Sequence, residues 1–377
     1  MGYELLVILS LAVGATVFVV TVSIGLVIHK FLNVRTARRR KRLYEAYSGA
    51  LAKVLLQEIP PLPRDARTSA IFDRYEEMIR SLKERIDAAA PRRRTRLREA
   101  LRQALIDFAR DMTGEVSGRL VYYFYSFGFV DDQIRLLSDR RWWVRAQAAR
   151  DAGILKARRT ITALTAALED EHPDVRIQAM ESLIRIVGVE ALRTIFRVSR
   201  GLSLWTSVEL SVIVLDFGET AVPFLIEGLG SADQSIVMFC VEMLSAIGFV
   251  HAVEPLRAIA AGSQNVVVRA RAIEALGRLG DERAEDLLIE SLGNPNPEIR
   301  TEALNALGRI GTPHALHPLV RMLRSGSLAE KIAAGRAIVR SGTAGTEILR
   351  QFEHDDDPLL AGAAGQVIEE REWEAEQ

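Results

Sequence analysis

The chain has 377 residues, of which 49% are hydrophobic, 26% are charged and 6% are aromatic. It is too long for one compact core and too apolar for a disordered or collagen-like protein, so we expect two or more structural units. Lysine plus arginine and aspartate plus glutamate number 49 each, which excludes the strongly basic composition of a dedicated DNA-binding protein.

This balance hides an uneven distribution of charge along the chain. Residues 30–110 contain 21 basic and 10 acidic side chains, whereas residues 343–377 contain 2 basic and 10 acidic ones. The single cysteine, Cys240, cannot form an internal disulfide bond. The sequence therefore shows no adaptation to an oxidising compartment.

The first predicted element is an uncharged stretch that runs from Leu5 to Ile28. At about 1.5 Å per residue it can cross a hydrocarbon core of about 30 Å, and it lacks the basic n-region and cleavage site of a signal peptide. We therefore predict a transmembrane anchor over residues 1–29. The basic residues that follow place the rest of the chain in the cytoplasm by the positive-inside rule, which predicts a single-pass inner-membrane protein with its N-terminus outside.

The basic flank after this segment has two interpretations. Next to a predicted membrane helix it is typical of a segment that contacts anionic lipid. A basic run of this kind also occurs in nuclear-localisation and nucleic-acid-binding segments. We favour the lipid contact and expect no nucleic acid as a partner. The residues predicted to face lipid are Arg35, Arg38, Arg39, Arg40, Lys41 and Arg42.

Residues 30–130 are predicted to form a basic helical neck. Pro60, Pro61 and Pro63 cannot be accommodated inside a helix, so they predict a hinge at residues 60–63. Residues 122–143 contain eight aromatic side chains among arginines. Such a segment suits stacking on bases or sugars, and it also suits packing of the neck against the helices that follow. We favour packing, although the sequence leaves open whether the cluster is core or interface.

From residue 131 the sequence repeats itself at a regular interval. Apolar residues at Val144, Val175, Val237, Val268 and Ile299 are separated by multiples of 31, and glycines close the successive units. Each unit contains a short helix, a polar turn and a longer helix. Two antiparallel helices cannot bury their apolar faces alone, so the units are expected to stack into an α-solenoid.

A basic side chain follows the repeated apolar position at Arg145, Arg176, Arg269 and Arg300, and Lys331 continues the series. This ladder has the chemistry to bind phosphates. It can also pair with acids and carbonyl groups of the turns in its own or the next repeat. We favour the second interpretation, in which the ladder staples the repeats.

The second-helix sequences VRIQAMESLIRIVG, VRARAIEALGRLG and IRTEALNALGRIG resemble HEAT repeats of the short bacterial type, also called phycobilisome-lyase-like repeats. The resemblance implies an all-α fold with a solenoid of about seven to eight repeats over residues 131–370 and an acidic tail, 371–377. Such repeats serve scaffolds, lyases and nucleic-acid enzymes alike. An anchor and neck before them resembles bacterial membrane-anchored HEAT-repeat proteins, which are associated with membrane polysaccharide-synthesis enzymes.

Candidate catalytic and metal-binding residues are few. His314 and His317 have a spacing that a metal ion could use, but the stretch around them offers no further ligand. Cys240 lies in an apolar run and is interpreted as a small core residue. No Walker loop or Ser-His-Asp order is found. We expect no cofactor, no metal ion and no enzymatic activity.

The predicted function is therefore a membrane-anchored cytoplasmic scaffold that binds a protein partner at the inner membrane, and the resemblance implies a membrane polysaccharide-synthesis enzyme as that partner. Two alternatives stay open. A lyase-type modifying enzyme on the same repeats would need a polar cavity lined by a Cys, His or Asp with a perturbed pKa. Nucleic-acid binding through the basic neck would need salt-sensitive affinity for duplexes.

The predicted partner surface lies on the second helices of the third and fourth repeats, with the polar faces of the fifth to seventh repeats as the alternative. In the fifth and sixth repeats, polar side chains form the outer face, whereas apolar residues stand at the corresponding positions of the third and fourth. An exposed apolar patch marks an interface, unless the neck or a second protomer covers it. The predicted partner-binding residues are Val208, Val212, Phe239, Met243, Arg271, Glu274, Arg278, Glu302, Asn305 and Arg309.

Overall fold

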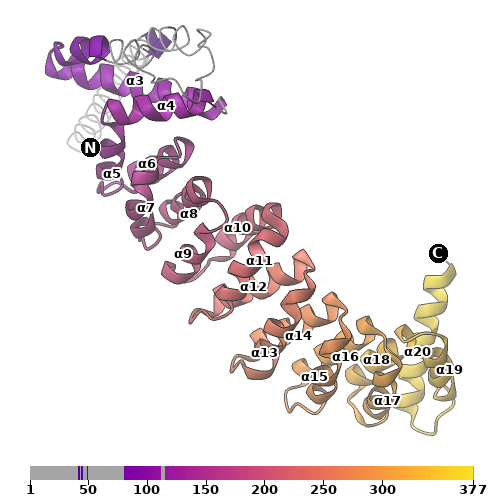
Figure 1. Cartoon of the computed structure of the whole chain (residues 1–377). Helices are drawn as coiled ribbons and strands as arrows, with labels where there is room; N and C mark the ends of the chain where they lie inside the picture. The colour runs from indigo at the N-terminus through magenta and orange to yellow at the C-terminus, as the bar shows by residue number, and fades with distance from the viewer. Residues whose placement is uncertain (1–40, 43, 46–48, 50–79, 112–114, 377) are drawn as a thin grey trace, which may run out of the picture. The chain divides into compact units, whose positions relative to one another are not determined.

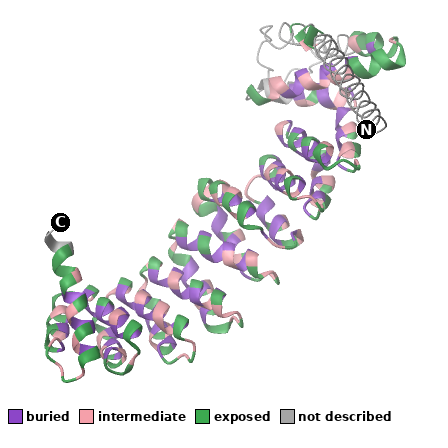
Figure 2. Ribbon diagram, turned by 180° about the vertical axis from the view of Figure 1, so that it is seen from behind, coloured by how far each residue is buried: buried purple, intermediate pink, exposed green. Residues whose placement is uncertain are grey.

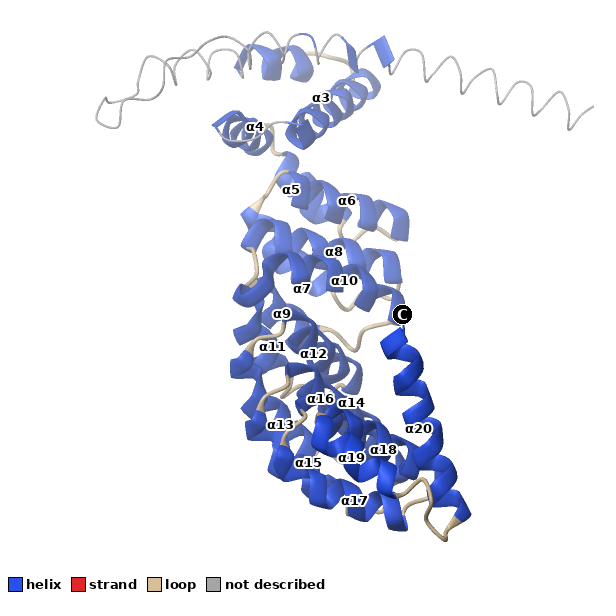
Figure 3. Cartoon of the chain, turned by 90° about the vertical axis from the view of Figure 1, so that its right-hand side faces the viewer, coloured by secondary structure: helices blue, strands red, loops and turns tan. Residues whose placement is uncertain are grey.

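The computed structural model describes residues 41–42, 44–45, 49, 80–111 and 115–376. Regular secondary structure in these ranges is helical throughout (Figure 3), in agreement with an all-α repeat solenoid. The chain separates into two compact units that divide after Thr160, here called the N-terminal unit and the C-terminal unit.

The prediction of an N-terminal transmembrane helix is corrected. No helix in the described ranges is long and apolar enough to cross a membrane. Even α3 (Pro91–Asp111), with 21 residues, buries one stripe of Leu and Ala side chains and carries arginines on its other faces. The segment on which the prediction rested, residues 5–28, lies outside the described residues, as does the proline hinge at 60–63. The single-pass inner-membrane localisation and its orientation are withdrawn with it.

The N-terminal unit packs the neck against the first helix pair. Its helices are α3, α4 (Glu115–Ser126), α5 (Phe129–Leu136) and α6 (Trp142–Ile154). Arg102 on α3 donates a hydrogen bond of 2.9 Å to the buried carboxylate of Asp151 on α6. Burial raises the pKa of Asp151, although the charge of Arg102 opposes that effect. This ion pair joins the neck to the first repeat inside the core of the unit.

The aromatic cluster divides between core and surface. Tyr123, Phe124, Phe127 and Phe129 are buried in the core of the N-terminal unit, together with leucines of α3. The exposed members are Tyr122, Trp142 and Trp143. The favoured interpretation of packing is confirmed for the four buried rings.

In the C-terminal unit the helices follow one another as pairs (Figure 1). The first helices of the pairs form one row and the second helices form the other (Figure 3). Buried residues lie between the rows and exposed residues on their outer surfaces (Figure 2). The first helices are α7 (Ile161–Ala167), α9 (Ala191–Val198), α11 (Val222–Gly228), α13 (Val253–Gly262), α15 (Glu285–Ser291), α17 (Leu316–Ser325) and α19 (Thr343–Gln351). The second helices are α8 (Pro173–Val187), α10 (Leu204–Phe217), α12 (Gln234–Ile247), α14 (Val266–Leu279), α16 (Pro297–Ile310), α18 (Leu328–Arg340) and α20 (Pro358–Glu376).

Short polar caps begin the second helices. The side chains of Ser203, Asp233, Asn265 and Asn296 accept hydrogen bonds from backbone N–H groups in the first turns of α10, α12, α14 and α16. These bonds satisfy donors that have no partner within the helix. The caps therefore fix where each second helix begins and which of its residues face the core.

The caps also reveal a shift of register in the fourth repeat. The interval from Ser203 to Asp233 is one position shorter than the period of the repeats, whereas the interval from Asp233 to Asn265 is one position longer. Counted from the caps, the equivalent of Val268 is Ile236, which is one residue before the Val237 that a constant period selects. Every position assigned in α12 from that period is consequently displaced by one residue.

The basic ladder staples the repeats, as predicted. Arg145, Arg176 and Arg300 each donate to the carbonyl oxygen six residues earlier, at distances of 2.9, 2.8 and 2.7 Å. The ammonium group of Lys331 donates to the carbonyl oxygens of Leu323 and Arg324. Arg300 also donates to the buried carboxylate of Glu330 in the following repeat, at 2.6 Å. Each staple holds the turn that leads into its own second helix.

The later repeats are held together by a seam of small residues. A Cβ atom added at Gly277 on α14 would lie 2.5 Å from the Cα atom of Ala306 on α16. One added at Gly308 on α16 would lie 2.7 Å from the Cα atom of Ala337 on α18. Only glycine permits such an approach of two helix backbones. We call these four residues the Gly–Ala seam.

The acidic tail is part of the last helix. α20 runs on to Glu376, so the tail begins within this helix and is not a separate segment. Its Glu370 carboxylate accepts two hydrogen bonds of 2.8 Å from Arg336 on α18. These bonds, together with one from Gln366, lower the pKa of Glu370 to about 2.

Candidate protein-binding surface

The outer face of α10 carries a continuous row of exposed apolar side chains. The row, here called the α10 stripe, consists of Leu204, Trp205, Val208, Val212 and Leu215. Trp205 is 66% exposed and Val212 is 67% exposed. From Trp205 onward the members are spaced by three, four and three residues, so they lie on one side of the helix.

The stripe exists because α10 is apolar on two sides. Its buried residues are only Thr206, Leu210 and Val214, which form the narrow face that contacts the rest of the unit. A helix with one apolar stripe needs no second one to stack on its neighbours. The additional apolar residues are not needed for stacking, and they remain between 45% and 85% exposed to water.

The structure separates the four apolar residues predicted for this surface. Val208 and Val212 are exposed, whereas Phe239 is 2% exposed and Met243 is 8% exposed. The ring of Phe239 packs against that of Phe196 on α9, with centroids 6.0 Å apart. The prediction that Phe239 and Met243 belong to an exposed patch is wrong. For Met243 the cause is the register shift of α12. Phe239 is equivalent to Arg271 when counted from the caps, and it is buried because its ring packs against Phe196. Glu242, and not Met243, occupies the position equivalent to Glu274.

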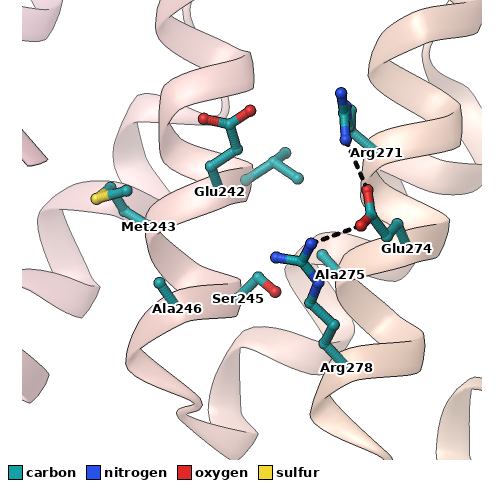
Figure 4. Close-up of a pocket in the computed structure, with 9 residues that line it drawn as sticks. Glu242, Met243, Ser245, Ala246, Arg271, Glu274, Ala275 and Arg278 are labelled. Carbon is teal, nitrogen blue, oxygen red and sulfur yellow. Dashed lines mark hydrogen bonds and ion pairs between the residues drawn. The ribbon is translucent and has the colours of Figure 1, made fainter. Parts of the chain in front are cut away.

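The polar residues predicted for the fifth and sixth repeats lie together on α14 and α16. Glu274 accepts hydrogen bonds from Arg271 at 2.8 Å and from Arg278 at 2.6 Å (Figure 4). Partial burial works against ionisation of Glu274, but the two arginines outweigh it and lower its pKa. The two arginines share one carboxylate, so the charge of Glu274 is fully compensated.

The neighbouring helix α16 continues this polar face. Burial and the nearby charge of Glu274 raise the pKa of Glu302. Asn305 forms a side-chain hydrogen bond with Glu302, and the charge of Arg309 partly offsets the rise. Between α12 and α14 lies an open groove of about 220 Å³, lined by Glu242 on one side and by Arg271, Glu274 and Arg278 on the other (Figure 4).

The segment that contains α10 and α12 is acidic, a feature that the sequence predictions missed. Residues 201–256 contain seven Asp and Glu residues and no Lys or Arg. The side chains of Glu209, Asp216, Glu219 and Glu242 form no ion pair in the described part of the chain. One carboxylate oxygen of Glu209 is buried without a hydrogen-bond partner among the described residues. A local count of charges would have revealed this segment, which the neutral average of the chain conceals.

Other candidate sites of the sequence are not brought together. Cys240 is buried, and burial raises the pKa of its thiol. His314 lies 3.6 Å from the carboxylate of Glu285, and His317 is exposed. In the ranges that the structure describes, no three His, Cys, Asp or Glu side chains converge on a point where a metal ion could bind.

The basic flank is described only at its end. Lys41 and Arg42 are exposed and helical, and Lys41 lies 3.9 Å from the carboxylate of Glu45. Arg35, Arg38, Arg39 and Arg40 lie outside the described residues. Contact of this flank with lipid stays a prediction.

Comparison with known proteins agrees with the repeat architecture. The family model described as HEAT repeats matches residues 132–197 and 253–339. These segments are HEAT repeats. The unmatched interval between the two HEAT segments, residues 198–252, contains α10 and α12, where the surface and the register depart from the other repeats. No curated protein matches the sequence.

Three solved structures match the chain at low sequence identity and low TM-scores. Human deoxyhypusine hydroxylase, in complex with glycerol, is 16% identical over 81% of this chain and 98% of its own, with a TM-score of 0.28. The complex of CpcE and CpcF of phycocyanin lyase from Nostoc is 19% identical over 71% and 94%, with a TM-score of 0.24. An engineered protein is 19% identical over 64% and 95%, with a TM-score of 0.22. At these values nothing about activity follows for the HEAT repeats described here.

Proposed function

We propose that this protein is a non-catalytic scaffold whose HEAT repeats bind a protein partner, and that the α10 stripe forms the centre of the contact. The observation that carries the proposal is the exposure of five large apolar side chains on one helix face. Soluble surfaces rarely keep contiguous apolar rows of this kind unless another protein covers them.

Burial of the stripe provides a substantial driving force for binding. Removing a Val or Leu side chain from water contributes about 1.5–3 kcal/mol, and aromatic anchors such as Trp205 are enriched among the residues that dominate interface energies. The paired charges of Arg271, Glu274 and Arg278 lie on α14, the second helix after α10 in the same row, and suit a polar rim. An apolar centre with a polar rim is the usual arrangement of a protein interface.

The proposal assigns no chemistry to the repeats. Cys240, the one thiol, is enclosed, and its raised pKa keeps it protonated at neutral pH. The narrower expectation of a polysaccharide-synthesis partner depended on the membrane anchor and is not part of the proposal.

Site-specific photo-crosslinking in cells tests the proposal. A photoreactive amino acid replaces Val212 in the stripe, and a control replaces Glu290, which is exposed on α15 in the opposite row. We expect protein adducts from position 212 that are absent from position 290 and that disappear when Val208→Asp is added. Equal adducts from both positions, or none from position 212, would contradict the proposal.

A further inference from the structure

We infer that the partner presents an amphipathic α-helix, with one apolar stripe flanked by lysine and arginine, which lies along α10. The inference rests on the proposed function and adds the chemistry of the partner. Two independent observations support it, the geometry of the α10 stripe and the charge of the segment around it.

The geometry of the stripe matches a helix. Its members Trp205, Val208, Val212 and Leu215 follow the spacing of three, four and three residues that allows two helices to interlock side by side. Ten residues separate the first from the last, which at 1.5 Å per residue is a length of roughly 15 Å. A partner helix of about three turns covers this length, and such helices bind through apolar anchors three and four positions apart.

The negative charge around the stripe favours a partner with positively charged side chains. Glu209 and Asp216 lie on α10 itself, and Glu219 follows it directly. Glu242 is exposed on α12, and counted from the caps it occupies the same position as Val212 on α10. None of these four carboxylates has an ion-pair partner in the described chain, although Arg271 lies near enough to Glu242 to interact with it electrostatically. Basic side chains beside the partner's stripe would supply the counter-charges that are missing around α10.

Glu209 strengthens the charge argument. Its buried carboxylate oxygen has no hydrogen-bond donor among the described residues, and an unsatisfied acceptor of this kind is costly. Because Glu209 as a whole is half-buried, an ammonium or guanidinium group of a helix docked at the rim of α10 would offset its negative charge. By contrast, Glu274 two helices away already has two arginines, so the preference for a cation is local to α10 and α12.

The same charges disfavour a second copy of this chain on the stripe. Pairing α10 with its own copy would bring together two segments, residues 201–256, that each carry seven acids and no Lys or Arg. Like charges close to one another across an interface oppose association. A basic partner helix removes this repulsion.

Two synthetic peptides test the inference with the full-length protein. Both are 18-residue helices with leucine in an apolar stripe, and they differ only in their flanking residues, which are all lysine in one and all glutamate in the other. Fluorescence anisotropy of labelled peptides measures the affinity. We expect the lysine peptide to bind at least tenfold more tightly, and its affinity to fall as the salt concentration rises.

Matched variants show whether binding occurs at the stripe. Val212→Asp should lower the affinity for the lysine peptide at least tenfold, whereas Glu290→Gln on the opposite row should leave it unchanged. The double change Glu209→Gln with Glu242→Gln should lower it severalfold and weaken its salt dependence. Circular dichroism confirms that each variant keeps its helices.

Three results would overturn the inference. The first is equal affinity for the two peptides. The second is binding of the lysine peptide that does not change in the Val212→Asp variant. The third is a dimer in sedimentation experiments that becomes a monomer in the Val212→Asp variant. In each case the crosslinks from position 212 decide the proposed function separately, since they require a bound protein but not a basic helix.

Discussion

The third and fifth repeats of this solenoid begin their second helices in the same way but present opposite surfaces. α10 and α14 each have 14 residues and a capped first turn. α14 buries seven residues, and its outer face carries Arg271, Glu274 and Arg278, whereas α10 buries three and exposes the stripe. The cap and a narrow buried face are thus enough to place a second helix in the row. The residues outside that face are free to differ between repeats, and they carry the specificity of the surface.

The strongest test of this comparison contrasts a buried with an exposed apolar residue. Phe239→Asp should lower the free energy of unfolding by more than about 3 kcal/mol, since it removes a buried ring and places a charge in the core. Val212→Asp should change it by less than about 0.5 kcal/mol because the side chain is exposed. Urea unfolding followed by circular dichroism measures both. Equal losses would show that the stripe belongs to the core after all.

A second test removes a staple that the third repeat lacks. The position of Arg300 is occupied by Ser207 in α10, counted from the caps. Arg300→Ala should cost about 3 kcal/mol, because it leaves the buried carboxylate of Glu330 without its cation and frees two turn carbonyls. Arg283→Ala serves as the control, because this exposed arginine pairs with Asp281 of its own turn and donates to the carbonyl oxygen of Val250 but contacts no buried carboxylate. If Arg300→Ala lowers the free energy of unfolding no more than the control does, the staple does not make its repeat more stable than the third repeat, which lacks one.

A third test addresses the Gly–Ala seam that joins α14 to α16. Gly277→Ala should cost about 1–3 kcal/mol, since the new methyl group has no room beside Ala306. Gly365→Ala lies in α20 with nothing within 4 Å of the added atom, and it should gain up to about 1 kcal/mol from helix propensity. Thermal unfolding midpoints that move in opposite directions would agree with this expectation, and a parallel rise would contradict it.

The smallest expected effect depends on pH. The pKa of Glu274 lies below its ordinary value of 4.5 because Arg271 and Arg278 outweigh the effect of burial. Its ionised form therefore stabilises the fold above pH 4.5, and this contribution is lost as the pH falls through the folded-state pKa. We expect Glu274→Gln to cost less than about 1 kcal/mol at pH 7 and progressively less as the pH falls below 4.5. A cost that does not decrease with falling pH would show that packing, and not charge, holds Glu274.

The repeat architecture could be predicted because its signals are periodic and local. The regular spacing, the polar turns and the basic ladder each reflect a contact that recurs in the structure, such as the bond from Arg176 to the carbonyl of Asp170. The exposed part of the site could be predicted only in part. Val212 stands out against its polar equivalents Glu274 and Asn305, counted from the caps. Val208 and Trp205 are equivalent to Ala270 and Val267, so no change from a polar to an apolar residue marks these two positions.

The error at Met243 has a physical origin. One short and one long repeat shift α12 by a single position, and a rotation of about 100° on a helix is enough to exchange a buried residue for an exposed one. The closing glycines contain this information, since the interval from Gly218 to Gly248 is one position short and that from Gly248 to Gly280 is one position long. The unpaired acids near α10 were not found because pairing depends on neighbours that only the fold brings together.

The Gly–Ala seam also has a mechanical consequence. Helix backbones in van der Waals contact at Gly277 and Gly308 can neither slide nor tilt without collision, so α14, α16 and α18 move as one stiff block. α10 is held by three buried side chains and lacks both seam and staple. When the C-terminal unit bends, we therefore expect the helices next to α10 to move more than the block of α14, α16 and α18. A partner bound to the stripe would restrict this movement.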